Sequence, residues 1–127
     1  MTVIRSEREI ELLRQANQIV ARVHDAMTEM VKPGISTREL DTAAEAIIRE
    51  SGATPAFKGY HGFPASTCIS VEEEVVHGIP GERVLQEGEI VSIDVGTCYQ
   101  GYYGDAALSH ACGKVDAARQ RLLDITD

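Results

Sequence analysis

The sequence predicts an α+β domain in which two long helices pack against an antiparallel sheet. Two segments near the N-terminus carry apolar residues at helical spacing, and each opens with a helix-capping pattern. Two later segments, 89–96 and 101–108, are β-like and meet at a turn that contains Gln100 and Gly101. A chain of 127 residues, 43% of them hydrophobic, is the size of one domain and can build a core.

The first helix is predicted to begin after Ser6, which forms a capping box with Glu9. It should end near Val31, because the Lys-Pro-Gly sequence at 32–34 cannot continue a helix. Its apolar residues recur at helical spacing with charged residues on the other side: Leu13, Ala16, Val20, Val23 and Met27. This stripe is expected to face the core.

The second helix repeats the capping pattern with Ser36 and Glu39, and Gly52 is a suitable residue just past its end. Its apolar residues form a second stripe: Leu40, Ala43, Ala44, Ile47 and Ile48. As in the first helix, these side chains are predicted to pack in the core and to carry no chemistry by themselves.

The amino-acid composition and the periodicity change in the middle of the chain. Residues 54–66 contain prolines, glycines and aromatic side chains without helical periodicity, which predicts an ordered loop. Residues 68–71 are a short strand candidate, and the sequence at 77–81 is typical of a turn. Residues 116–127 have the pattern of a helix start without a stop signal. We therefore expect residues 1–127 to form one domain unit that breaks off within a helix.

Asp94 and Asp105 are the most informative residues of the chain. Aspartate is depleted in strand interiors, and Asp94 interrupts an otherwise apolar strand. If the turn centres on Tyr99 and Gln100, the two aspartates lie directly opposite each other, about 5 Å apart. If it centres on Gln100 and Gly101, they become diagonal neighbours, about 7–8 Å apart. Both registers place the two carboxylates on the same face of the sheet.

Two like charges placed in this way destabilise a sheet unless a cation lies between them. Two divalent cations about 3.5–4 Å apart, bridged by carboxylates, are the arrangement that two-metal hydrolases use. The structural alternative is an inward carboxylate bonded to backbone amides, or a charge that protects a strand edge. Two aspartates are too few for a complete dinuclear site, so the other ligands must come from another segment or chain.

The histidines carry less information. His77 lies on a Gly/Pro turn, where a lone histidine is more often structural than functional. His24 lies inside the first helix and His110 near the end of a strand, and both are predicted to be structural. Because His110 is five positions from Asp105, it should point to the opposite face of the strand. On the residues alone, a small apolar cluster under the loop accounts for the rest: Tyr60, His61, Phe63 and Cys68.

The net charge of −8, from 20 acidic and 12 basic residues, argues against nucleic acid or an anionic membrane as the main partner. The sequence has no secretory signal and no long apolar run, so we expect an unexported, cytoplasmic protein that does not enter a membrane. Its three cysteines lack CxxC spacing, which fits a reducing compartment better than a disulfide framework.

Four short motifs form a specific combination. They are Gly-Tyr-His-Gly-Phe-Pro at 59–64, His-Gly-Ile-Pro at 77–80, Ile-Asp-Val at 93–95 and Gly-Tyr-x-Gly-Asp at 101–105. Together with the segment that begins at Cys68 and the Val-Lys-Pro-Gly-Ile-Ser-Thr-x-x-Leu-Asp sequence at 31–41, they resemble the type I methionine aminopeptidases. The resemblance covers nearly the whole chain.

This resemblance implies the pita-bread fold, in which two related α/β halves surround a dinuclear metal site at their junction. The chain would be the N-terminal half of that fold. Members of the family remove the initiator methionine with two divalent metal ions (cobalt, manganese, iron or zinc), which activate a water molecule for attack on the methionyl carbonyl. The implied partners are the N-terminal methionines of peptides and nascent proteins.

The resemblance also implies roles for individual residues. Asp94 matches a bidentate ligand of one metal ion, and Asp105 matches a carboxylate that bridges both. His77 matches a catalytic histidine that hydrogen-bonds the substrate near the scissile amide. The walls of the methionine pocket are matched by four residues, with His61 beside them: Phe57, Tyr60, Phe63 and Cys68.

The family's remaining ligands, a histidine and two glutamates, lie in the second half and have no counterpart in this sequence. The chain by itself is therefore expected to be inactive, and its exposed apolar surface is expected to self-associate or to pair with a C-terminal half. Two other interpretations stay open. One is a non-catalytic pita-bread half-domain that binds other proteins, and the other is a relative that cleaves before proline.

Overall fold

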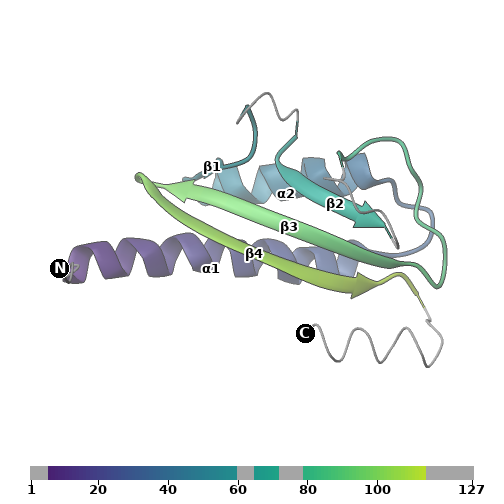
Figure 1. Cartoon of the computed structure of the whole chain (residues 1–127), viewed down its shortest axis with the longest axis horizontal. Helices are drawn as coiled ribbons and strands as arrows, with labels where there is room; N and C mark the ends of the chain where they lie inside the picture. Colours follow the sequence, from purple (N-terminus) through teal and green to yellow (C-terminus); the bar gives the residue numbers. More distant parts are fainter. Residues whose placement is uncertain (1–5, 60–64, 72–78, 114–127) are drawn as a thin grey trace.

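The computed structural model describes residues 6–59, 65–71 and 79–113, and these form two helices and an antiparallel sheet. In chain order the elements are α1 (Glu7–Met30), α2 (Thr37–Glu50), β1 (Thr54–Pro55), β2 (Thr67–Val71), β3 (Ile90–Tyr99) and β4 (Tyr102–Ala111). Both helices run along the sheet, α1 against β3 and β4 and α2 toward β1 and β2 (Figure 1). The predicted α+β fold class is confirmed.

The helix boundaries follow the predicted signals. At the start of α1, the Ser6 side chain accepts a hydrogen bond from the Glu9 backbone N–H, and the Glu9 carboxylate accepts one from the Ser6 N–H. Ser36 and Glu39 form the same reciprocal pair at the start of α2. Gly52 follows α2 with a φ of 85°, a conformation that glycine adopts at little cost. In the described ranges, neither helix is long and apolar enough to cross a bilayer.

The sheet is built around β3. One edge of β3 pairs with β4 along its whole length, and the other pairs with β1 and β2. Strand β1 corrects the expectation of an unbroken loop from residue 54, because Thr54 and Pro55 pair with Cys98 and Thr97. The strand was not predicted because a segment of two residues cannot show a periodicity. In addition, proline usually indicates a loop, although the edge strand of a sheet tolerates it.

The β3–β4 turn selects one of the two registers that the sequence left open. Gln100 and Gly101 have φ angles of 49° and 86°, and positive values at both central residues define a type I′ turn. Tyr99 therefore pairs with Tyr102. The same register pairs Asp94 with Ala107 and Gly96 with Asp105, so the two aspartates are diagonal neighbours. Both strands also extend beyond the predicted segments, to Tyr99 and Ala111.

The two faces of the sheet differ in burial. The helix-covered face of β3 carries four fully buried side chains: Val91, Ile93, Val95 and Thr97. The three valine and isoleucine side chains pack with both helices, as predicted, in one cluster that includes Val23, Met27, Leu40 and Ile48. On α1 the prediction was wrong for Leu13, because Leu12 and Ile19 are the buried residues there. The alternate residues of β3 and their neighbours form the opposite side, which we call the open face: Cys68, Ser92, Asp94, Gly96, Cys98, Tyr103 and Asp105.

His24 and His110 lie on the helix-covered side, and the predicted orientation of His110 is confirmed. Their rings stack between α1 and β4 with centroids 5.5 Å apart, and His24 Nδ1 lies 3.3 Å from His110 Nε2. The His24 Nε2–H donates to the Ala106 carbonyl oxygen at 2.8 Å. Both side chains are buried, so they join α1 to β4 and take no part in the open face.

Candidate metal centre and substrate pocket

The carboxyl groups of Asp94 and Asp105 meet on the open face of the β3–β4 hairpin. Asp94 is half-buried and Asp105 is exposed. Burial, followed by a hydrogen bond with Asp105 and repulsion from its charge, raises the pKa of Asp94 to about 7. The predicted shared face is therefore confirmed, in the diagonal register.

One oxygen of this pair lacks a partner. Among the described residues, the Asp94 Oδ1 atom is buried and accepts no hydrogen bond. A carboxylate that only served the fold would be expected to accept backbone or side-chain donors there. The edge-protection alternative also fails, because β3 is paired with β2 and β4 on both sides of Asp94. An unpartnered oxygen beside a second carboxylate fits a divalent cation as the missing counter-charge.

The described residues hold only part of such a centre. No cluster of three or more histidine, cysteine or acidic side chains that could hold a metal ion occurs within residues 6–59, 65–71 and 79–113. Among the described residues, the two carboxylates by themselves are too few for a complete metal site, as the sequence predicted from their number.

Two of the predicted pocket residues lie beside the carboxylates. Cys68 on β2 pairs with Asp94, which places its side chain on the same face. The Phe57 ring covers Gly96, because a Cβ atom at Gly96 would lie 2.9 Å from the ring atoms Cε1 and Cζ. Gly96 pairs in turn with Asp105. The open face thus brings Phe57, Cys68 and both aspartates together.

The other predicted site residues lie outside the described residues, and their roles stay predictions: Tyr60, His61, Phe63 and His77. Sequence reasoning also missed Gly96, although a glycine in a strand interior is a known signal of a close approach by another group. Here that group is the Phe57 ring.

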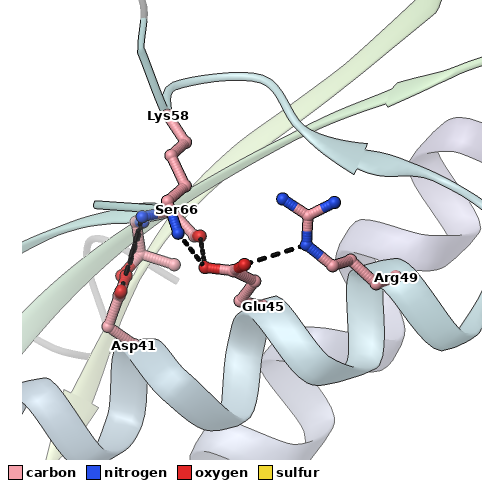
Figure 2. A network of polar contacts seen from close by, with 6 residues as sticks. Asp41, Glu45, Arg49, Lys58 and Ser66 are labelled. Carbon is pink, nitrogen blue, oxygen red and sulfur yellow. Dashed lines mark hydrogen bonds and ion pairs between the residues drawn. The ribbon is translucent and has the colours of Figure 1, made fainter. Parts of the chain in front are cut away.

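Sequence reasoning further missed two carboxylates of α2, Asp41 and Glu45, which sit one helical turn apart. Figure 2 shows both pointing from α2 toward the segment that holds Lys58 and Ser66. Hydrogen bonds from Lys58, Ser66 and Arg49 lower the pKa of Glu45 to about 2, so this side chain stays ionised at neutral pH. The spacing of four residues placed them on one face of the helix, but nothing in the sequence indicated what that face contacts.

Replacing Asp94 with asparagine is expected to stabilise the metal-free protein at neutral pH. The folded state holds the Asp94 proton up to about pH 7, whereas an unperturbed aspartate loses it near 3.8. Ionisation therefore costs folding free energy as the pH rises from about 4 to 7, and Asp94→Asn removes that cost. Allowing for solvent screening of a half-buried pair, we expect a gain of about 1–2 kcal/mol at pH 8 and almost none at pH 4.

Urea unfolding with a chelator present, at pH 4, 6 and 8, measures this difference. Asp25→Asn, which removes an exposed carboxylate from α1, is the matched control and should change stability little at any pH. A loss of stability in Asp94→Asn at pH 8 would show that the carboxylate is satisfied within the fold.

Comparison with known proteins gives a consistent result. Residues 11–127 match the model of metallopeptidase family M24. Methionine aminopeptidase 1 of Bacillus subtilis is 47% identical over the whole chain, which covers 51% of that protein. The crystal structure of methionine aminopeptidase from Thermotoga maritima superposes with a TM-score of 0.93 at 40% identity, over 99% of this chain and 51% of that one. The enzyme from Rickettsia prowazekii superposes equally, at 36% identity and with the same coverage. The chain thus spans about half the length of the relatives it matches.

Proposed function

Because this chain belongs to metallopeptidase family M24 and has the fold of the N-terminal half of a pita-bread protein, we propose that it supplies part of a methionine aminopeptidase site. The proposed reaction is the metal-dependent removal of the N-terminal methionine from nascent polypeptides. The observation that carries it is the Asp94–Asp105 pair, with its unpartnered oxygen, beside the pocket residues Phe57 and Cys68.

In this proposal Asp94 and Asp105 hold two divalent ions, of cobalt, manganese, iron or zinc. When bound, such ions lower the pKa of a water molecule and polarise a carbonyl group. The half-buried position of Asp94 supports this role, since a divalent cation would replace the proton that the carboxyl group holds near neutral pH. The remaining ligands would come from a complementary second half.

The residues around the carboxylates would bind the substrate. Phe57 and Cys68 offer an aromatic ring and a thiol to the thioether side chain of methionine, and such soft contacts suit an unbranched apolar group. Tyr60, Phe63 and His61 would complete this pocket. His77 would donate a hydrogen bond to the substrate near the scissile amide and so stabilise charge that develops there.

The alternative of a non-catalytic binding half-domain is less well supported. In such a protein the repulsion between Asp94 and Asp105 would lower the stability of the fold, and no cation would compensate for it. Cys68, Cys98 and Cys112 are reduced cysteines, which is consistent with the proposed cytoplasmic location.

We expect the purified natural protein that contains this chain to release methionine from a Met-Ala-Ser peptide in the presence of Mn²⁺. Amino-acid analysis measures the product, and a chelator should abolish its release. A Leu-Ala-Ser peptide tests side-chain selection, and an Ala-Pro dipeptide tests cleavage before proline. Release of alanine from the proline dipeptide, with no methionine from the first peptide, would replace the proposal by the proline-specific alternative. No release from any peptide would favour the binding module.

A further inference from the structure

Asp41 holds the start of β2. Its Oδ1 atom accepts hydrogen bonds from the Thr67 backbone N–H at 2.7 Å, the Thr67 hydroxyl at 2.6 Å and the Ser66 N–H at 3.1 Å. Ser66 and Thr67 are fully buried, so water cannot replace these bonds. The residue that follows is Cys68, which faces Asp94. The Asp41 carboxylate therefore fixes the position of the backbone directly before Cys68.

Glu45 joins both ends of the segment between β1 and β2. It accepts a hydrogen bond from the Ser66 hydroxyl at 2.7 Å and pairs with the Lys58 ammonium group at 2.8 Å (Figure 2). Arg49, one turn further along α2, donates to its other oxygen at 2.8 Å. Lys58 directly follows Phe57, whose ring covers Gly96. The same α2 face thus anchors the chain beside Phe57 and beside Cys68.

The two ion pairs of Glu45 are poorly explained by a contribution to stability alone. The Lys58 and Arg49 side chains remain 45% and 51% exposed, and ion pairs of that kind contribute little to folding free energy. Their geometric effect is larger, because they fix Lys58, next to Phe57, and Ser66, close to Cys68, relative to α2.

We propose that Asp41 and Glu45 are positioning residues for the methionine pocket, which set the places of Phe57 and Cys68 by anchoring Lys58, Ser66 and Thr67 to α2. This inference rests on the proposed function for the identity of the substrate. Neither side chain touches the reacting atoms in this scheme. Their effect passes through Lys58 to Phe57 and through Thr67 to Cys68.

The anchoring is tested first without any assay of activity. Amide hydrogen exchange, read by mass spectrometry on peptides covering residues 56–71, reports on the N–H groups of Ser66 and Thr67 that Asp41 accepts. Asp41→Ala should raise exchange in these peptides, whereas Asp41→Asn keeps the Oδ1 acceptor and should restore protection. Glu50→Gln, an exposed α2 carboxylate outside the network, is the matched control and should change nothing. Unchanged exchange in Asp41→Ala would overturn the anchor.

The effect on the pocket is tested in the natural protein by steady-state kinetics. Asp41→Ala and Glu45→Ala should raise KM for a methionyl peptide about tenfold and change kcat less than about twofold, since binding and not the reaction step is altered. The preference for methionine over leucine in kcat/KM should fall about tenfold as well. A merely structural role would reduce the amount of folded enzyme and leave KM and this preference unchanged.

A double-mutant cycle isolates the Lys58 contact. Glu45→Gln and Lys58→Gln should each raise KM, and the double variant should be no worse than Glu45→Gln alone, because that change already removes the ion pair with Lys58. Additive effects, or raised exchange with unaltered KM and preference, would overturn the positioning role. If the wild-type protein released no methionine, the proposed function would fail and this inference with it, while the exchange data would still report on the anchor.

Discussion

Replacing Asp105 with asparagine is expected to lower methionine release by at least about a hundredfold and to abolish tight Mn²⁺ binding. The variant keeps the size of the side chain but removes the negative charge that lies against Asp94 on the open face. Divalent ions of this kind depend on charged oxygen ligands, and loss of a ligand or its charge commonly costs large factors in affinity. Asp94→Asn should have a comparable effect.

Calorimetric titration with Mn²⁺ measures binding directly, and methionine release from Met-Ala-Ser measures activity. Asp25→Asn is again a suitable control, because it removes one exposed acidic charge of α1, the helix that packs on the other face of the sheet. The two readouts should fall together. Undiminished Mn²⁺ binding in both Asp94→Asn and Asp105→Asn would show that the hairpin carboxylates hold no metal, and the proposed site would be lost.

Replacing Gly104 with alanine should destabilise the fold by about 1–3 kcal/mol, a typical cost of forcing an atom into a packed interior. A Cβ atom at Gly104 would lie 2.7 Å from the Ala16 carbonyl carbon and 2.9 Å from the Asn17 nitrogen, and both belong to the α1 backbone. Strand β3 holds α1 at the same point, because the Thr97 hydroxyl donates a hydrogen bond to the Ala16 carbonyl oxygen at 3.0 Å. The helix therefore cannot move away without losing this bond.

Chemical denaturation of the wild type and the variant measures this loss. Gly81→Ala is the matched control, because a Cβ atom at Gly81 approaches its nearest neighbour only to 3.9 Å and its φ is not in the left-handed region. It should change stability by less than about 0.5 kcal/mol. Equal stability of the two variants would mean that α1 lies further from β4 than the structure places it. Because Asp105 follows Gly104, the same variant should also weaken metal binding.

Much of the local structure was predictable from short stretches of sequence. Ser6 and Ser36 identify the helix starts because the capping bonds join residues only three positions apart. The shared face of Asp94 and Asp105 was predictable for a similar reason, since both possible turns kept the parity that decides which side a strand residue faces. The motifs also identified the family, because they combine several short sequences at fixed spacing along the chain.

The exact pairing of the hairpin depended on the backbone of two residues. Either turn was compatible with the sequence, and the positive φ angles at Gln100 and Gly101 decided for the diagonal arrangement of the carboxylates. Strand β1 likewise exists because β3 offers Cys98 and Thr97 as partners, and not because of any pattern within its own two residues.

The sequence by itself therefore determined the helices, the hairpin and the face on which the two carboxylates lie, since each depends on interactions between near neighbours in the chain. Only the tertiary structure decided how Asp41 and Glu45 reach the segment beside Phe57 and Cys68, and why a side chain at Gly104 would meet the backbone of α1. Those contacts join residues from separate elements, and their distances depend on how α1 and α2 pack against the sheet.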